Sequence, residues 1–503
     1  MKRCKDLREY IEILRSLGEI QEINQAIDWN LEIGAITRRS YELPAPAPLF
    51  NNIINTEKGF RVFGATVGLS HNQNRPLTRI AVSLGLPPES NAATIIDTMA
   101  GWQYQKKHIP CKLVDTAPCK QNKMLGDEVD IFRFPTPYLH EDDGGRYFAT
   151  MGVIVCQSPD KKWTNWSVQR CMLHTEKNKL CINIPGGQKL GKHAGMIHAM
   201  WQAINQPMPF ALVQGVEPLV VMISSTPLPD FISEGDVLSG FIGEPVDVVR
   251  CETIDLEVPA SAEIVIEGYI GTETATEGPM GEYGGFITPG GTRIKPLADI
   301  TGITYRDNAI LPVCAAGEPP EENHTCWGTG VAASILGELR QQGFPVTTCF
   351  IPFESAMGWV VVTIDSNYQA PDTDPDSTSF VSDIGKAIFS TRAGVNVPRA
   401  IVVHDDIDPS NIRDVAWVLA TRCHPDIGEI HLYDFLHNPL EIMLHSDEIN
   451  PPVSPKTVYN CLFQGRSPAA SARRSSFKYI YPKELQDKIL SNWTSYGYEE
   501  TRN

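Results

Sequence analysis

The chain lacks an apolar run long enough to span a membrane. Every uninterrupted apolar stretch falls well short of the roughly 18 residues that a membrane helix needs. An export signal is not apparent either, because charged residues are threaded through the opening segment MKRCKDLREYIEILRSLGEI, where such a signal would carry an apolar core. These absences predict a soluble, cytoplasmic protein without a membrane partner.

Paired cysteines are also lacking. The twelve cysteines are scattered along the chain, and none forms the CxxC spacing that is typical of zinc and redox sites. In a reducing compartment an isolated cysteine behaves as a small apolar residue, so we expect most of these thiols to be free and buried.

Basic residues are fewer than acidic residues. Lysine and arginine number 43 against 60 aspartates and glutamates, which gives a formal net charge of −17. A surface of this sign repels phosphate backbones, so a nucleic-acid partner is not expected. The 503 residues are otherwise of ordinary globular composition, 42% apolar and 20% charged, which argues against a disordered or fibrous protein. This length suits about three domains.

Segments with different hydrophobic patterns follow one another and predict a mixed α/β fold. Residues 1–128 combine helical and short apolar runs, as in a small α/β domain. Residues 129–322 are rich in β-forming runs joined by tight turns, which predicts a mainly antiparallel sheet or barrel. Residues 323–465 alternate helices and strands, as βαβ units around a partly parallel sheet do. The tail, residues 466–503, predicts a linker and a docking helix.

The densest group of candidate chemical residues is TEGPMGEYGG at 276–285. Its glycines and proline exclude a helix and allow a tight backbone on which Glu277 and Glu282 can converge. Two carboxylates in different environments can divide acid and base work, because burial raises the pKa of one while a cation keeps the other ionised. An acidic surface loop is the alternative interpretation.

A second candidate is WTNWSVQR at 163–170, which contains Asn165 and Arg170. Arginine is suited to bidentate capture of a carboxylate or a phosphate. The two residues are five positions apart, so an ideal strand would point them to opposite faces, and a shared site requires a bulge or a strand end between them. A plain strand with a solvent-facing arginine is the alternative.

A third candidate is SSTPLPDFISE at 224–234. Here Glu234 could ligate a hard cation together with Asn165, while simple helix capping by Ser233 is the alternative. Gly328-Thr329-Gly330 resembles a phosphate-binding turn only weakly, because the later glycine and lysine are missing. No regular ligand spacing links the histidines, for which structural roles are expected on spacing alone: His193, His198, His324 and His437.

The three segments, in this order and at these separations, resemble the UbiD-type decarboxylases, which include fungal ferulic and cinnamic acid decarboxylases. The likeness extends almost end to end, through DLREYIEIL, PTPYLHEDDGGRY, KKWTNWS and SYGY. It implies a central split β-barrel of the flavin-reductase type and reversible loss of CO2 from an aromatic or unsaturated acid. It also implies prenylated FMN as cofactor, a divalent metal (Mn²⁺ or Mg²⁺) and K⁺.

The resemblance assigns catalysis to Arg170, Glu277 and Glu282. A carboxylate on an sp² carbon leaves a carbanion when CO2 departs, so a cofactor must accept the electrons. By hypothesis Arg170 orients the substrate carboxylate and keeps Glu277 ionised, while Glu282 donates the proton to the carbon.

The resemblance also assigns the residues that hold the cofactor and its metal. The metal ligands are Asn165, Glu234 and Gln188, where Gln188 replaces the usual histidine and weakens the site, with His193 as a nearby substitute. Arg392 stands where the family has a lysine that meets the cofactor phosphate. Further cofactor contacts are expected from Trp163, Ser167, Val168 and Ser224.

The positions aligned with the substrate pocket are aromatic and polar, whereas cinnamate-type members have mostly aliphatic or thioether side chains there. Polar groups in an apolar pocket are costly unless the ligand pairs with them. We therefore expect a hydroxylated benzoate-like or heteroaromatic acid, held either in a cycloadduct or in a singly attached adduct, with a cinnamate or ferulate substrate as the alternative. The pocket residues are Tyr283, Trp327, His437, Asn438 and Leu440.

Other partners and functions follow from the same likeness. We expect a homo-oligomer, a dimer or a hexamer, that depends on a separate flavin prenyltransferase. A glycoside hydrolase with two catalytic carboxylates and a non-catalytic flavin-binding protein are the more remote alternatives.

Overall fold

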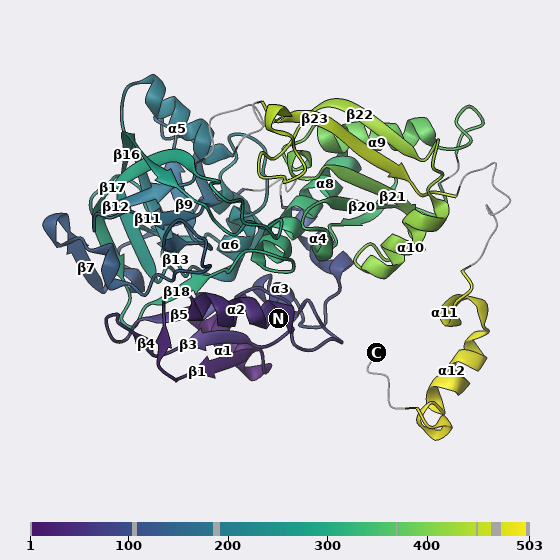
Figure 1. The fold of residues 1–503 in the computed structure, drawn as a ribbon, viewed down its shortest axis with the longest axis horizontal. Coiled ribbons are helices and arrows are strands. Elements are labelled where there is room, and N and C mark those ends of the chain that lie inside the picture. The colour runs from purple at the N-terminus through teal and green to yellow at the C-terminus, as the bar shows by residue number, and fades with distance from the viewer. Residues whose placement is uncertain are drawn as a thin grey trace.

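The computed structural model describes residues 3–102, 108–184, 192–368, 370–448, 451–463 and 474–498. The fold is of the mixed α/β type that the sequence predicts, with three main sheets and helices around them (Figure 1). No helix in these ranges combines the length and the apolar character needed to cross a membrane. All twelve cysteines are free, and most are buried.

The N-terminal part is built on a four-stranded sheet with the order β1-β3-β5-β18. Its last strand comes from much later in the chain and pairs in parallel with β5. Leu7, Tyr10, Ile11 and Leu14 bury one face of α1, and Asp6 caps this helix by accepting a hydrogen bond from the Glu9 amide. The elements are α1 (Leu7–Ser16), β1 (Ile20–Ile23), β2 (Ile27–Asp28), α2 (Glu32–Glu42), β3 (Ala47–Phe50), β4 (Ile53–Ile54), β5 (Arg61–Gly64), α3 (Thr78–Ser83), α4 (Ala92–Ala100) and β18 (Ile310–Val313).

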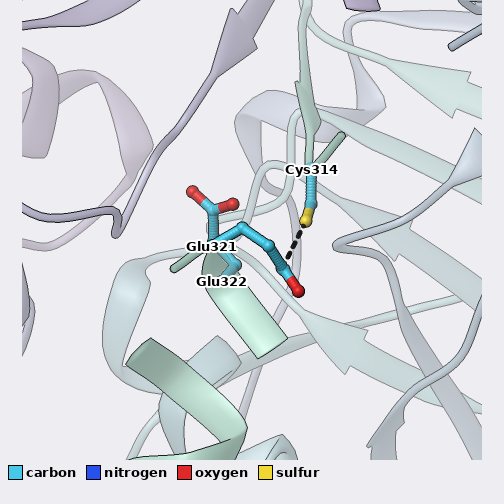
Figure 2. Close-up of side chains that lie close together, drawn as sticks. All are labelled: Cys314, Glu321 and Glu322. Carbon is cyan, nitrogen blue, oxygen red and sulfur yellow. Dashed lines mark hydrogen bonds between the residues drawn. The ribbon is translucent and has the colours of Figure 1, made fainter. Parts of the chain in front are cut away.

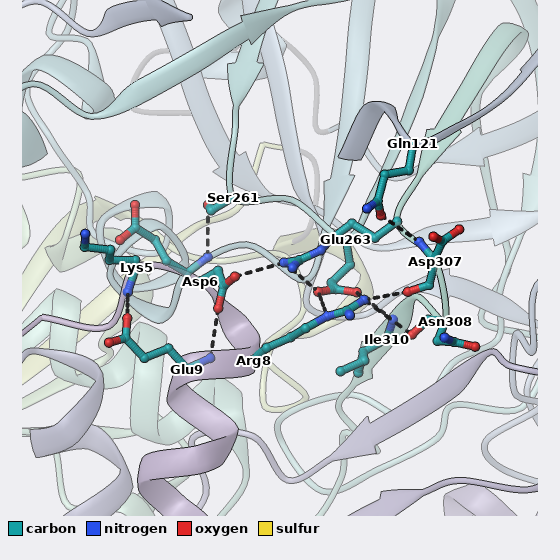
Figure 3. Close-up of polar contacts among 12 residues, drawn as sticks. Lys5, Asp6, Arg8, Glu9, Gln121, Ser261, Glu263, Asp307, Asn308 and Ile310 are labelled. Atoms are coloured by element: carbon teal, nitrogen blue, oxygen red, sulfur yellow. Dashed lines mark hydrogen bonds and ion pairs between the residues drawn. The ribbon is translucent and has the colours of Figure 1, made fainter. Parts of the chain in front are cut away.

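A charge network fastens α1 to the central sheet (Figure 3). Arg8 donates to both oxygens of the Glu263 carboxylate at 2.8 Å each. Arg306 lies 2.9 Å from Asp6 and 3.1 Å from Glu263. Two guanidinium groups therefore compensate a carboxylate that is fully removed from solvent.

The central part is a curled antiparallel sheet that forms a half-barrel, with the strand order β10-β9-β13-β16-β17-β12-β11-β8 and β7 paired to β17. A separate three-stranded sheet has the order β15-β14-β6. The elements are β6 (Lys112–Val114), β7 (Asn122–Leu125), β8 (Tyr147–Ala149), β9 (Val153–Gln157), β10 (Thr164–Val168), β11 (Cys171–Leu173), β12 (Lys179–Ile182), α5 (His193–Ala203), β13 (Met208–Gln214), α6 (Pro218–Ser224), α7 (Glu234–Ile242), β14 (Asp247–Arg250), β15 (Glu257–Pro259), β16 (Ile264–Glu277) and β17 (Arg293–Tyr305).

The C-terminal part contains a five-stranded sheet with the order β19-β20-β21-β23-β22. The central pairs of this sheet are parallel and both edge pairs are antiparallel, which agrees with the predicted βαβ units. A π-helical segment, Asn323–Gly328, leads into α8. The elements are α8 (Thr329–Gln341), β19 (Val346–Phe350), β20 (Trp359–Ile364), α9 (Thr378–Phe389), β21 (Arg399–His404), α10 (Ile412–Arg422), β22 (Glu429–Leu436) and β23 (Val453–Asn460).

The last elements, α11 (Phe477–Ile480) and α12 (Lys483–Ser491), stand away from the rest of the protein (Figure 1). They carry large apolar side chains that are exposed to solvent: Phe477, Ile480, Tyr481, Leu485 and Leu490. In the parts of the chain that the structure describes, the predicted docking helix is thus not buried on another domain.

Candidate active site

A cavity of about 410 Å³ lies between the half-barrel and the C-terminal part. Its volume is in the range of about 300 to 1,000 Å³ that is common for small-molecule sites. The wall contains most of the residues predicted from the sequence: Asn165, Ser167, Val168, Arg170, Ser224, Glu234, Glu282, Tyr283, Trp327, Arg392, His437, Asn438 and Leu440. Glu277 and Trp163 lie directly behind this wall, in contact with Arg170 and His193 respectively.

Arg170 brings the two predicted acids together. Its Nε and Nη2 donate to the two oxygens of Glu277 at 2.8 and 3.0 Å, and its Nη1 donates to Glu282 at 2.6 Å. Burial by itself lowers the pKa of Arg170, but the two carboxylates outweigh burial and raise this pKa above its ordinary value. The Glu277 side chain is only 1% exposed and that of Glu282 is 23% exposed, so Glu282 is the acid that a ligand can reach.

The local sequence explains how these three residues meet. Strand β10 ends at Val168, so the strand end expected between Asn165 and Arg170 is present, and both residues line the cavity. In the loop after β16, Gly278 has a φ of +87°. A Cβ atom on Gly281 would lie 2.7 Å from the His140 ring, which leaves no room for a larger residue.

The segment around Tyr147 supports the acids, a role that the sequence alone did not indicate. Asp143 accepts a hydrogen bond from the Gly281 amide at 2.9 Å, and the Gly144 amide donates to the Pro279 carbonyl at 2.7 Å. The Tyr147 hydroxyl donates to Glu277 at 2.8 Å. Burial and the neighbouring Glu277 carboxylate raise the pKa of Tyr147, so its proton stays in this hydrogen bond. The motif PTPYLHEDDGGRY, which contains Asp143 and Gly144 and ends at Tyr147, is the sequence signal of this segment.

The predicted metal ligands lie together around Glu234. Asn165 donates to one oxygen of this carboxylate at 2.8 Å, and the Trp166 amide donates to the other at 2.8 Å. His193 Nδ1 lies 3.6 Å from Glu234 Oε1. Gln188, the predicted third ligand, falls outside the described residues. Ser233 does not cap α7 with its side chain, so the capping alternative is wrong.

An arginine and a serine at this end of the cavity leave polar atoms without a protein partner. Arg392 Nη2 donates to Asp230, whereas its Nη1 is buried with no hydrogen bond among the described residues. Ser224 Oγ is likewise buried and unpartnered within those ranges. Buried polar atoms of this kind are costly unless a ligand satisfies them, and both fit an anionic group such as a phosphate. Asp230, which also lies 3.2 Å from His193, was missed in the sequence.

The substrate end of the wall contains the five predicted pocket residues. The rings of Tyr283 and Trp327 meet edge to face, with centroids 5.1 Å apart. Both ring nitrogens of His437 are occupied, Nδ1 by Glu441 at 2.7 Å and Nε2 by the Ser454 carbonyl at 3.2 Å. His437 therefore shapes the wall and offers no free nitrogen to a ligand.

Two polar residues at this end differ in what they can offer a ligand. Asn438 donates to Asn396 at 3.2 Å, and its own Oδ1 accepts from the Leu440 amide. Asn323, which sequence reasoning missed, also lines the cavity, and its amide nitrogen is held by the Glu321 carboxylate at 3.0 and 3.1 Å. The fixed amide nitrogen of Asn323 leaves its Oδ1 as an acceptor.

A second pair of acids, Glu321 and Glu322, lies close to Cys314 (Figure 2), and Glu322 lines the cavity. The Cys314 thiol donates to Glu321 at 2.9 Å, and Tyr41 donates to Glu322, which also accepts from the Val67 amide at 3.2 Å. Burial raises the pKa of Glu322 to about 7, and burial together with the two acids raises the pKa of Cys314. Ligand atoms of all three side chains lie within 4.8 Å of one another, but a protonated thiol beside these carboxyl groups is better described as a proton-sharing network than as a metal site.

Comparison with known proteins identifies the family. The N-terminal, Rift-related and C-terminal domain models of 3-octaprenyl-4-hydroxybenzoate carboxy-lyase match residues 11–99, 112–319 and 324–460 in that order. The chain belongs to the UbiD family. This UbiD-family chain is therefore a carboxy-lyase, as predicted, and the glycoside hydrolase alternative is wrong.

Curated relatives cover the whole length of this UbiD-family chain. It is 39% identical to pyrrole-2-carboxylic acid decarboxylase of Pseudomonas aeruginosa over 498 residues, which is 98% of each chain. It is 36% identical to ferulic acid decarboxylase 1 of Saccharomyces cerevisiae over 508 residues, again 98% of each chain.

Solved structures share the fold. Vanillic acid decarboxylase of Sedimentibacter hydroxybenzoicus in its closed form superposes with a TM-score of 0.80 at 23% identity, over 98% of this chain and 100% of that one. The UbiD-class enzyme HmfF of Pelotomaculum thermopropionicum in complex with FMN gives 0.78 at 24% identity, over 97% and 100%. An evolved dimeric form of HmfF in complex with prFMN gives 0.74 at 22% identity, over 94% and 99%.

Proposed function

We propose that this carboxy-lyase removes CO2, reversibly and without net oxidation, from a heteroaromatic or hydroxylated aromatic acid, with prenylated FMN as its cofactor. The observation that carries the proposal is the arrangement of Arg170, Glu277 and Glu282 at the wall of a cavity of about 410 Å³. When bound, prenylated FMN supplies an electron-accepting ring for the electron pair that CO2 leaves behind.

The residues of the cavity fit this cofactor. Arg392 Nη1 and Ser224 Oγ, which lack partners in the described parts of the chain, suit the phosphate of the flavin. We infer further contacts from Ser167 and Val168, which line the cavity, while Trp163 supports the site from behind by packing on His193.

For the divalent metal, Mn²⁺ or Mg²⁺, we propose Asn165, Glu234 and His193 as ligands. Carboxylate and amide oxygens suit both ions, and imidazole is a common ligand of transition metals. The 3.6 Å separation between His193 and Glu234 supports His193 in the place that the sequence assigned to Gln188. Manganese binding to the purified protein should weaken in His193→Ala and stay unchanged in Gln188→Ala, and the opposite result would restore Gln188.

The chain's own residues divide the proton chemistry. Arg170 and Tyr147 hold Glu277 in place, out of solvent. Glu282 is partly exposed and is bound by one nitrogen of Arg170, so it can turn toward the substrate. After it has turned away from Arg170, Glu282 takes up a proton from solvent. As the bond between the ring carbon and the carboxylate breaks and CO2 leaves, this proton passes from the Glu282 carboxyl group to that carbon.

The polar substrate end supports a heteroaromatic or hydroxylated ring. Asn323 presents an acceptor oxygen, and the buried Tyr283 hydroxyl has no partner among the described residues. A relative that is 39% identical is a pyrrole-2-carboxylic acid decarboxylase, whereas the ferulic acid decarboxylase is 36% identical. The test is CO2 release by enzyme loaded with prenylated FMN from pyrrole-2-carboxylate, hydroxybenzoates and cinnamate. Turnover of pyrrole-2-carboxylate or a hydroxybenzoate above cinnamate is expected, and turnover of cinnamate alone would overturn the substrate class.

Four further proposals remain. The resemblance implies a K⁺ ion at the site and supply of the cofactor by a separate flavin prenyltransferase, and the sequence pattern supports a cytoplasmic location and domain limits after residues 128, 322 and 465. The exposed apolar side chains of α11 and α12 support a homo-oligomer, for which we propose a dimer over a hexamer. Light scattering of the intact protein should give twice the 55.7 kDa chain mass, and a mass of one chain would refute assembly.

A further inference from the structure

The charges around Arg170 do not by themselves favour a carboxylate substrate. One guanidinium is shared by the carboxylates of Glu277 and Glu282, at distances of 2.6 to 3.0 Å. This group carries a net charge of −1 when both acids are ionised, and it is neutral when Glu282 holds the proton that it donates. In neither state does the group offer a net positive charge to an incoming carboxylate, which therefore needs further positive charge close by.

Unpaired cations line the same cavity on β17. Lys295 makes no hydrogen bond or ion pair with any described residue, and Arg293 makes only a 3.5 Å contact from its Nη2 to the Pro439 carbonyl. Both side chains are half-buried. In the strand register Arg293 lies opposite Glu277, which places this part of β17 beside the catalytic acids.

A third cation, Lys192, enters the cavity from the start of α5. Its Nζ makes only a 3.4 Å contact to the Val168 carbonyl within the described ranges. The segments that the structure does not describe contain no acidic residue other than Glu499 and Glu500 at the C-terminus. In a chain with a net charge of −17, three cations in one cavity without a carboxylate partner indicate an anionic ligand.

We propose that Lys295 and Arg293, flanked by Lys192, form the binding site for the carboxylate group of the substrate and deliver it to Arg170 and Glu282. The inference rests on the proposed decarboxylation, and it names the groups that would bind the negative end of the aromatic acid. The cofactor phosphate is the other anion of the reaction, but Arg392 and Ser224 already offer it unpartnered atoms.

The test is the steady-state kinetics of Lys295→Met and Arg293→Met in enzyme loaded with prenylated FMN. Loss of a charged partner of the substrate should raise the KM for the aromatic acid about tenfold or more, with kcat changed only a few-fold. Flavin content should stay at the wild-type level, and Lys295→Arg should restore most of the KM. The matched control is Lys162→Met, which removes a lysine charge from an exposed side chain and should leave KM unchanged.

Competitive inhibitors distinguish the loss of the Lys295 charge from the loss of its packing. The inhibition constant of an unreactive aromatic carboxylate should rise in Lys295→Met, while that of its neutral carboxamide should not. An unchanged KM in both variants would overturn the inference, and loss of flavin from both would assign the site to the cofactor phosphate instead. If wild-type enzyme turned over no acid at all, the proposed function itself would fail, which is a different result.

Discussion

Two pairs of glutamates lie beside the same cavity, and they are compensated in different ways. Glu277 and Glu282 share the guanidinium of Arg170. Glu321 and Glu322 contact no lysine or arginine among the described residues and instead accept hydrogen bonds from neutral donors such as the Tyr41 hydroxyl and the Cys314 thiol. Burial raises the pKa of Glu322 to about 7.

In the proposed reaction, the difference also distinguishes the acid that can reach the substrate from the acid that cannot. The Glu282 side chain is 23% exposed, whereas Glu322 as a residue is 1% exposed and has its oxygens occupied by Tyr41 and Val67. Only Glu282 can exchange its hydrogen-bond partner, Arg170, for a substrate. Position next to a cavity is therefore not enough to assign a catalytic role to an acid. The group that compensates the carboxylate, an arginine or neutral donors, must be considered as well.

The largest effect should come from removing the shared cation. Arg170→Met leaves Glu277 buried without its counter-charge, and we expect kcat to fall about 10³-fold or more, together with a loss of about 3 kcal/mol in stability. Arg170→Lys keeps the positive charge but lacks the planar guanidinium group, so it should recover only part of the lost kcat and part of the lost stability. Turnover and thermal unfolding measure the two effects, and near-wild-type values in Arg170→Met would contradict the contrast between the pairs.

Glu322→Gln probes the second pair through the acid whose pKa is raised. The pKa of Glu322 is raised to about 7 in the folded state, above its ordinary value of 4.5. The contribution of Glu322 to stability should therefore be full below pH 4.5 and be lost as the pH rises toward 7. The slope is about 1 kcal/mol per pH unit, and it should disappear in Glu322→Gln, which mimics the neutral acid. Parallel pH profiles of the unfolding midpoint for both proteins would show that Glu322 is ionised after all.

Tyr147→Phe should have the smallest effect. It removes one hydrogen bond to Glu277, worth about 1 kcal/mol, so kcat should drop roughly fivefold. The control is Tyr269→Phe on β16, the strand that ends at Glu277, where the Tyr269 hydroxyl makes no hydrogen bond to the described residues. Equal kcat values for both variants would remove Tyr147 from the support of the site.

The parts of this molecule that the sequence could predict are those encoded in contiguous segments. The TEGPMGEYGG motif predicted that Glu277 and Glu282 can converge, and the family resemblance added Arg170 to them. The five-residue separation from Asn165 to Arg170 required a bulge or a strand end, and the strand end is present. Strands that pair across long separations in the sequence leave no local pattern by which the pairing could be predicted. Strand β18 joins a sheet formed some 250 residues earlier, and β6 joins β14.

The same limit applied to the supporting residues. Glu322 accepts hydrogen bonds from Tyr41 and Val67, which lie far away in the sequence. Asp143 accepts a hydrogen bond from the Gly281 amide, which lies in another loop. The histidine beside Glu234 had no ligand spacing to reveal it, because strands β11 and β12 lie between Asn165 and His193 in the chain.

The most direct test of the central claim is hydrogen–deuterium exchange at the reacting carbon of the product, measured in deuterated buffer for wild type and Glu282→Gln. Flavin content is read from the absorbance of the same samples. The account predicts equal flavin in both proteins, rapid exchange in wild type, and exchange about 10² to 10⁴ times slower in Glu282→Gln. Exchange at the wild-type rate in Glu282→Gln would show that the proton comes from another group and would contradict the account.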